Sequence, residues 1–175
     1  MRKMTLNEVN NLSPEGFAGR FGFLFEHSPW VAEEAAAHRP FETLGGMQAA
    51  LARALFFATD DQKLAVFRAH PRLADKAAIK EGLTKESASE QASAGLDSLT
   101  PEEFARFGEL NAAYDARFGF PFIVAVRAAG GKTGVLKAMT ERLSNSDIQE
   151  QRNALDEVVK IVGLRLQDVV EGELI

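Results

Sequence analysis

The residues with the clearest capacity for chemistry lie between His70 and Gln91. Residues 60–68 have acidic side chains at the start, a basic one at the end and apolar ones at helical spacing, so they predict a helix that ends near His70. Pro71 enforces that end, because the residue before a proline is pushed out of the α-helical region. We therefore expect His70 in an extended conformation near the negative end of a helix dipole, which favours the protonated imidazole.

Ser87 and Glu90 have the spacing of a capping box, in which the serine hydroxyl and the glutamate carboxylate each bind a backbone amide at the start of a helix. Spacing alone favours this structural interpretation over catalysis. The catalytic alternative is a helix that begins at Ser87 and presents its free amides, Glu90 and Gln91 to the cavity that His70 faces. A carboxylate beside a histidine fixes the ring and raises its pKa, so such a pair can transfer protons.

Two further polar side chains fall among apolar ones. Asn111 lies among the aromatic residues of a helix that starts at Thr100, and we expect it to make a structural hydrogen bond rather than to contact a ligand. Arg165 falls on the apolar, inward stripe of the last long helix, which is predicted from residues 144–147 towards residue 170. An inward guanidinium stays charged and needs a carboxylate or an anionic ligand, and the pattern alone favours neither.

The stretch of residues 118–127 is the exception to a chain that otherwise predicts helix after helix. Glycine and proline interrupt it, so we expect an extended segment whose amides and carbonyls must be satisfied by a ligand or a neighbouring loop. No second strand of comparable quality is available to pair with it. The sequence therefore predicts an all-α fold, with a single domain over residues 1–175 built as a multi-helix bundle of about eight helices and one extended segment near residues 120–127.

Composition limits the classes of function. The chain of 175 residues is 46% hydrophobic, and no stretch approaches the roughly 18 uninterrupted apolar residues of a membrane span. It has no cysteine, which excludes disulfides and thiolate metal sites and fits a reducing compartment. Its three histidines and scattered acidic residues give no metal signature. The net charge of -5 argues against a nucleic-acid surface, and the basic N-terminus lacks the apolar core of a secretory signal.

Six motifs are weak one by one but specific in their order and spacing. They are Glu26-His27-Ser28-Pro29-Trp30, His70-Pro71, Ser87-Ala88-Ser89-Glu90-Gln91-Ala92-Ser93-Ala94-Gly95-Leu96, Leu110-Asn111-Ala112-Ala113-Tyr114, residues 118–123, and Leu164-Arg165-Leu166. As a set they resemble the 2-oxo-4-hydroxy-4-carboxy-5-ureidoimidazoline (OHCU) decarboxylase family over nearly the whole chain. This resemblance implies an all-helical, cofactor-free enzyme, typically a homodimer, that performs the last step from urate to (S)-allantoin.

The resemblance also implies roles for individual residues. His70 would be catalytic, Glu90 its carboxylate partner and Arg165 an anchor for the anionic substrate. The residues that would line the substrate, the last five largely through backbone groups, are Pro71, Ser87, Ala88, Ser89, Gln91, Phe122, Ile123, Val124, Ala125 and Val126. We expect a small-molecule ureidoimidazoline substrate, no nucleic-acid or membrane partner, and a cytoplasmic location. Periodicity leaves two alternatives open, a non-catalytic helical interaction module and a related enzyme acting on another ureido acid.

Overall fold

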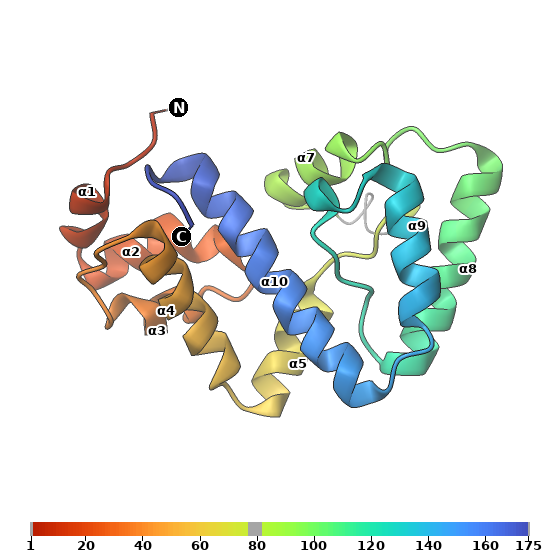
Figure 1. Ribbon diagram of the computed structural model, residues 1–175, viewed down its shortest axis with the longest axis horizontal. Helices are drawn as coiled ribbons and strands as arrows, with labels where there is room; N and C mark the ends of the chain where they lie inside the picture. The colour runs from red at the N-terminus through yellow and green to blue at the C-terminus, as the bar shows by residue number, and fades with distance from the viewer. Residues whose placement is uncertain (1, 77–81, 175) are drawn as a thin grey trace. The chain divides into compact units, whose positions relative to one another are not determined.

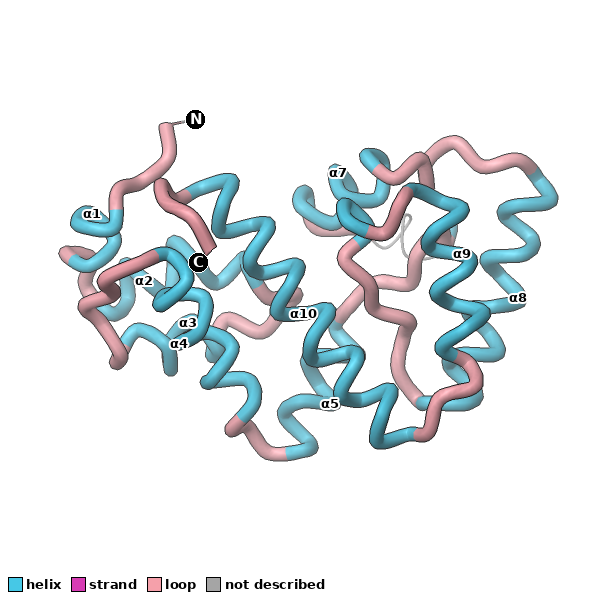
Figure 2. Tube along the Cα trace, in the orientation of Figure 1, coloured by secondary structure: helices cyan, strands magenta, loops and turns pink. Residues whose placement is uncertain are grey.

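The structure is a computed structural model that describes residues 2–76 and 82–174. Those residues form nine α-helices. Helices and loops, with no strand, make up the described trace in Figure 2, so the expected all-α class is confirmed. The extended segment is also confirmed, because residues 119–125 form neither helix nor strand. It ends two residues earlier than predicted, since residues 126 and 127 belong to the short 3-10 helix η2 (Val126–Ala128).

The chain divides into two compact units, which we describe separately. The first unit contains the residues up to Ala69 together with those from Val158 onwards, and the second unit is His70–Glu157. One helix, α10 (Asp147–Val169), supplies residues to both units. The prediction of a single domain over residues 1–175 stays a prediction.

The first unit is built from short helices around an apolar core. Besides the last part of α10, its elements are α1 (Leu6–Asn10), α2 (Pro14–Phe21), η1 (Gly22–Leu24), α3 (Trp30–Ala36), α4 (Leu44–Phe56) and α5 (Asp60–Ala69). Helix α3 packs against both α2 and α4. Phe17, Phe21 and Leu51 are fully buried in this core, and each such side chain stabilises the fold by roughly 1.5–3 kcal/mol relative to an exposed position.

The two ends of the first unit are joined by backbone hydrogen bonds. Met4 forms an isolated parallel bridge with Val170, in which the Met4 amide donates to the carbonyl oxygen of Val169 at 2.8 Å and the Glu171 amide donates to that of Met4 at 2.8 Å. These bonds tie the chain before α1 to the end of α10.

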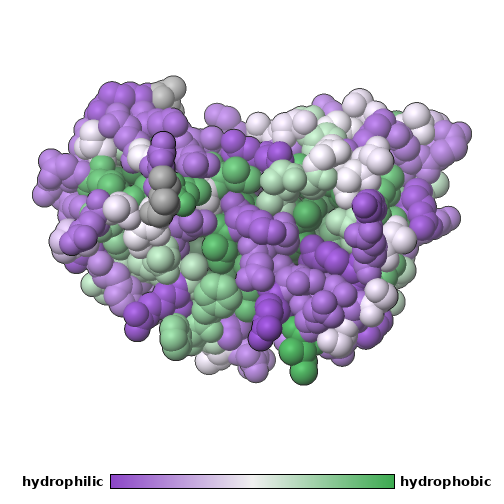
Figure 3. Space-filling model, in the orientation of Figure 1, coloured by the Kyte–Doolittle hydropathy of each residue, from purple (hydrophilic) through white to green (hydrophobic). Residues whose placement is uncertain are grey.

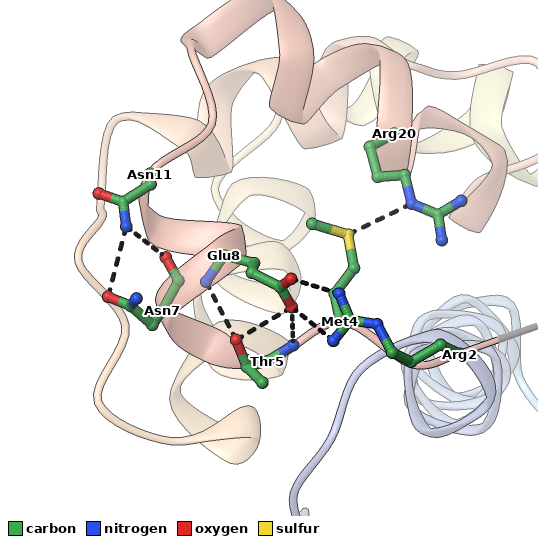
Figure 4. Close-up of polar contacts among 7 residues, drawn as sticks. All are labelled: Arg2, Met4, Thr5, Asn7, Glu8, Asn11 and Arg20. Atoms are coloured by element: carbon green, nitrogen blue, oxygen red, sulfur yellow. Dashed lines mark hydrogen bonds and ion pairs between the residues drawn. The ribbon is translucent and has the colours of Figure 1, made fainter.

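The start of α1 carries a capping box reinforced by an ion pair (Figure 4). The Glu8 amide donates to Thr5 Oγ1 at 3.2 Å, and the Thr5 amide donates to Glu8 Oε2 at 2.8 Å. The guanidinium of Arg2 pairs with the same carboxylate. The Arg2 hydrogen bond first, and the Thr5 amide second, lower the pKa of Glu8 to about 2.

The second unit gathers the later helices around the extended segment. Besides the first part of α10, its elements are α7 (Lys85–Ser93), α8 (Pro101–Phe118), η2 and α9 (Gly131–Arg142). Helix α9 packs against α8 and η2, and α7 packs against η2; α8 and α9 lie side by side in Figure 1. Gly134 allows α9 to lie close to the residue that follows η2, because a Cβ on Gly134 would lie 1.7 Å from the carbonyl oxygen of Ala129. The contact between α7 and η2 places α7 close to the end of the extended segment.

Hydrophilic residues cover much of the molecular face drawn in Figure 3, with apolar residues between them. The large apolar side chains that are exposed within the described residues are those of Phe56, Phe57 and Ile148. No helix in that part of the chain is long and apolar enough to cross a bilayer. The same residues contain no group of three or more histidine or carboxylate side chains placed to hold a metal ion.

Candidate active site

His70 stands directly after a helix, as the sequence predicted. Helix α5 ends at Ala69, so the helix end ahead of Pro71 is confirmed. His70 and Pro71 are both half-buried. The imidazole is therefore on a partly accessible turn, where a ligand can reach it.

The predicted start of α7 was wrong. The N-cap is Thr84, whose Oγ1 accepts a hydrogen bond from the Ser87 amide at 3.2 Å, and the helix begins at Lys85. Threonine is also a preferred N-cap residue, and a cap three residues ahead of Ser87 lengthens the helix by almost one turn. Ser87 therefore lies inside the first turn, and its amide is not free for a ligand. Glu90 lies in the body of the helix, so no capping box with Ser87 explains its carboxylate.

Helix α7 turns one face inward and one outward. Ser87 and Gln91 are four residues apart, share a face and are each 6% exposed. Glu90 is half-buried at the border of that face, whereas Ala88 and Ser89 are exposed. The predicted site residues of this helix thus divide into an inward pair, a border carboxylate and an outward pair.

Two buried amide side chains hold the loop that follows His70. Gln91 Oε1 accepts a hydrogen bond from the Ala74 amide at 3.1 Å, and Asn111 Nδ2 donates to the carbonyl oxygen of Leu73 at 2.9 Å. The structural hydrogen bond expected for Asn111 is therefore confirmed. Gln91 joins α7 directly to the loop that carries His70, so the structure brings these two predicted parts of the site together within one unit.

Polar side chains also satisfy part of the extended segment. Arg142 Nη1 donates to the carbonyl oxygen of Ile123 at 2.8 Å, and the Ala125 amide donates to Glu157 Oε2 at 2.8 Å. Among the described residues, no hydrogen bond engages the backbone of Phe122 or Val124. Val124 is half-buried, whereas the other four residues predicted to line the substrate here, Phe122, Ile123, Ala125 and Val126, are buried. Val124 is therefore the one of these five residues that is not buried, and no hydrogen bond engages its backbone among the described residues.

A buried carboxylate fixes the arginine that holds Ile123. Glu150 is fully buried, and its Oε1 accepts hydrogen bonds from Arg142 Nε at 2.8 Å and from the Tyr114 hydroxyl. Its Oε2 accepts a hydrogen bond from the side-chain Nδ2 of Asn145 at 2.8 Å. Burial by itself raises the pKa of Glu150, but the hydrogen bonds from Arg142, Tyr114 and Asn145 outweigh it and leave that pKa below its usual value.

Sequence reasoning missed this cluster, although a signal for it was present. Glu150 lies eight residues before Val158 and four before Ala154, so it falls on the same buried stripe of α10. An acidic residue on an apolar stripe needs a buried partner, as was argued for Arg165. Burial and the Glu150 carboxylate also raise the pKa of the Tyr114 hydroxyl, which keeps that group protonated as a donor.

Arg165 is buried on the inward stripe of α10, as predicted. Its Nη2 lies 3.0 Å from Glu26 Oε1, and these side chains are 4% and 2% exposed. Its Nη1 donates to the carbonyl oxygens of Phe23 at 3.2 Å and Leu24 at 3.3 Å. The pattern had left a carboxylate and an anionic ligand open, and the structure supplies the carboxylate. Arg165 belongs to the first unit, whereas His70 opens the second.

Comparison with known proteins adds a consistent set of relatives. The sequence matches the OHCU decarboxylase family over residues 10–167. The 2-oxo-4-hydroxy-4-carboxy-5-ureidoimidazoline decarboxylase of Haloferax volcanii is 40% identical over 173 residues, which cover 99% of this chain and 100% of the relative.

Two solved structures are similar in fold. A crystal structure of (S)-allantoin synthase is 33% identical and has a TM-score of 0.73; the match covers 94% of this chain and 54% of the other, so this chain spans about half of that protein. A crystal structure of OHCU decarboxylase in the presence of (S)-allantoin has a TM-score of 0.68, covers 85% of this chain and 95% of its own, and at 23% identity supports the fold alone.

Proposed function

This chain belongs to the OHCU decarboxylase family, and from that premise we propose that His70 and Glu90 form its catalytic pair. The protein is a carboxy-lyase that decarboxylates OHCU to allantoin in urate degradation. The observation that carries the proposal for the site is the bond from Gln91 to Ala74, which joins α7, the helix of Glu90, to the loop of His70. Glu90 lies on that helix three residues after Ser87 and next to Gln91, so the same hydrogen bond keeps its part of α7 beside the loop.

The chemistry of the substrate sets what the protein must supply. The substrate carries its carboxylate and hydroxyl on a ring carbon next to a C=N carbon, so the electrons released with carbon dioxide can flow into that imine. The substrate thus contains its own electron sink, and we propose that no cofactor takes part. The protein has to hold the carboxylate out of the ring plane and deliver one proton to one face of the enol-like intermediate, which yields (S)-allantoin. Orientation and general acid–base catalysis provide these steps.

In this proposal His70 manages the proton steps and Glu90 orients its ring and supports its charge. Gln91 uses Oε1 to hold Ala74, while its buried Nε2 has no hydrogen-bond partner among the described residues. A buried amide donor without a partner is costly, so we assign Nε2 to a carbonyl of the substrate. The amide and carbonyl of Val124 are assigned to the ureido or ring carbonyl groups.

The remaining lining residues have more limited roles. Ser87 contributes its side chain, because its amide is bound to Thr84. Pro71, Ala88 and Ser89 and the other residues of the extended segment shape the surroundings of the substrate. Arg165 is proposed as the anchor for the substrate carboxylate because of its place in the family motif. Its fork is preoriented by Glu26 and two backbone carbonyls, which reduces the entropy lost on binding an anion.

We propose further that the enzyme is a cytoplasmic homodimer without nucleic-acid or membrane partners. The dimer follows the pattern typical of the family, and the absence of cysteine fits a reducing compartment. The net charge of -5 disfavours binding to nucleic acid. Sedimentation equilibrium would contradict the dimer if it gave the mass of one chain.

The decisive experiment generates the unstable substrate in situ from urate and follows the chirality of the allantoin by circular dichroism. We expect the wild-type protein to accelerate formation of (S)-allantoin and His70→Ala to abolish that acceleration with helical content unchanged. The matched control is His38→Ala, which removes an exposed histidine of the first unit and should keep full activity. Wild-type rates in His70→Ala would remove His70 from the mechanism.

A further inference from the structure

We infer that Asn111 is a positioning residue. It keeps His70 in its catalytic position by a hydrogen bond to the loop at Leu73, three residues further along the chain. This inference rests on the proposed function, because it requires His70 to be the catalytic group. Asn111 donates through Nδ2 to the carbonyl oxygen of Leu73 at 2.9 Å, and its side chain is buried. We assign its action to that carbonyl. Its buried Oδ1 has no hydrogen-bond partner among the described residues, and KM of the variants below tests whether that oxygen meets the substrate.

Three consecutive residues of the loop are each held by a side chain from another helix. Arg72 Nε pairs with Asp115 Oδ2 at 2.5 Å, the carbonyl of Leu73 accepts from Asn111, and the amide of Ala74 donates to Gln91. The Arg72 and Asp115 side chains are 48% and 24% exposed, and an ion pair so open to water stabilises little. The loop is therefore held mainly by the two buried side-chain amides of Gln91 and Asn111, of which Asn111 lies on α8.

The backbone conformation of the loop is one that such hydrogen bonds must stabilise. Ala74 has φ +53°, in the left-handed region that residues with a Cβ adopt only at an energetic cost. Leu73 and Ala74 are 7% and 3% exposed, so their polar backbone groups cannot turn to water instead. Without the Asn111 bond the buried Leu73 carbonyl loses its partner and the loop can relax, and His70 is separated from Leu73 by only two residues.

Misplacement of a catalytic group by about 1 Å can cost about 10²-fold in rate. We therefore expect Asn111→Leu, which keeps the approximate size but removes the donor, to lower kcat by about 10- to 100-fold. KM should change by less than about 3-fold, because a positioning residue acts on His70 and not on substrate binding. The pH profile of kcat should shift as well, since the surroundings of the His70 imidazole change.

A second variant tests the hydrogen bond itself. Asn111→Asp keeps the shape, but its side chain donates only in the protonated form. We expect its kcat relative to wild type to rise as the pH is lowered, whereas Asn111→Leu should show no such recovery. Asn111→Asp also provides the measurement if the leucine variant fails to fold.

The matched control is Asn10→Leu in the first unit. Asn10 grips a loop in the same manner, with Nδ2 donating to the Phe41 carbonyl at 2.9 Å and Oδ1 accepting from the Phe41 amide at 2.8 Å. Its loss should lower the melting temperature but leave kcat, KM and the pH profile as in the wild type. A purely structural Asn111 would behave like Asn10.

The outcomes separate the inference from the function on which it rests. Wild-type kcat in a folded Asn111→Leu protein, while His70→Ala is inactive, overturns the inference alone. A raised KM with unchanged kcat also overturns it, because Asn111 would then bind the substrate directly. Full activity of His70→Ala overturns the proposed catalytic role of His70, and with it the inference about Asn111.

Discussion

The buried pair of Arg165 and Glu26 allows a prediction whose size follows from the structure. Arg165→Met keeps most of the length and apolar stem of the side chain and removes its charge. Glu26 is then left as a carboxylate whose side chain is 2% exposed, and the carbonyls of Phe23 and Leu24 each lose a hydrogen-bond donor at 3.2 and 3.3 Å.

Breaking a buried ion pair on one side costs roughly 3–5 kcal/mol, because the remaining charge stays buried after losing its counter-charge. For a chain of this length 1 kcal/mol corresponds to about 2–4 °C, so the apo melting temperature should fall by roughly 6–20 °C. The double variant with Glu26→Met should recover most of that loss, since replacing both partners with apolar groups is often neutral. The difference in melting temperature between the single and double variants measures how much the buried Glu26 carboxylate destabilises the protein once Arg165 is removed.

Thermal melts followed by far-ultraviolet circular dichroism provide the assay, with and without allantoin as ligand. The matched control is Arg106→Met, which breaks an ion pair with Glu109 whose side chains are 51% and 69% exposed. That loss should be less than about 1 kcal/mol. If Arg165→Met melted no lower than Arg106→Met, the reasoning about the buried pair would be refuted.

The same assay tests the proposed role of Arg165 in binding. Arg165→Lys keeps the charge but cannot reproduce the planar fork of the guanidinium. If Arg165 anchors the substrate, this variant should show a smaller rise in melting temperature on addition of allantoin or a carboxylated analogue. An unchanged rise would exclude Arg165 from the site and leave His70, Glu90, Gln91 and backbone groups to hold the substrate.

Three further predictions follow from the same structure. Glu90→Gln should lose much of the rate of (S)-allantoin formation while its melting temperature stays near that of the wild type, because the amide keeps the shape and some hydrogen bonding of the side chain but removes its charge. Full activity with lowered stability would contradict this. The pKa of Glu150 and of Glu8, about 2 for the latter, lies below the ordinary 4.5, so the unfolded chain binds more protons in that window. Stability from both groups is thus present above pH 4.5 and falls as the pH drops through the folded pKa values, which melts between pH 5 and 2 should show; an unaltered pH dependence in Glu150→Gln would count against it. Dialysis against a strong chelator should leave the activity unchanged, and activity that was lost and then restored by a divalent metal would overturn the cofactor-free proposal.

The sequence by itself determined the features that follow local rules. The helix before His70 ends where Pro71 requires, because the proline ring restricts the residue before it. Helix α8 starts after Thr100 with its capping box, and Arg165 lies on the inward stripe of α10, because capping and periodicity act over three or four residues. The break of the helical pattern at residues 119–125 was visible in the glycine and proline for the same reason.

The start of α7 was not predicted correctly. The capping-box spacing of Ser87 and Glu90 indicated a start at Ser87, and this local signal was misleading. In the folded chain Thr84 is the cap, and Ser87 and Gln91 together form the buried face of the helix. The burial of that face is a property of the folded chain, which the capping-box spacing alone does not contain.

The partners of the buried polar groups were decided by tertiary structure alone. Arg165 meets Glu26, 139 residues away, and Asn111 meets the carbonyl of Leu73, 38 residues away. The periodic pattern shows that a buried charge or amide needs a partner, because an unpaired polar group is costly to bury. It contains no information on which distant residue the fold brings within hydrogen-bond distance. Only the folded chain shows that Asn111 is hydrogen-bonded to the loop that follows His70.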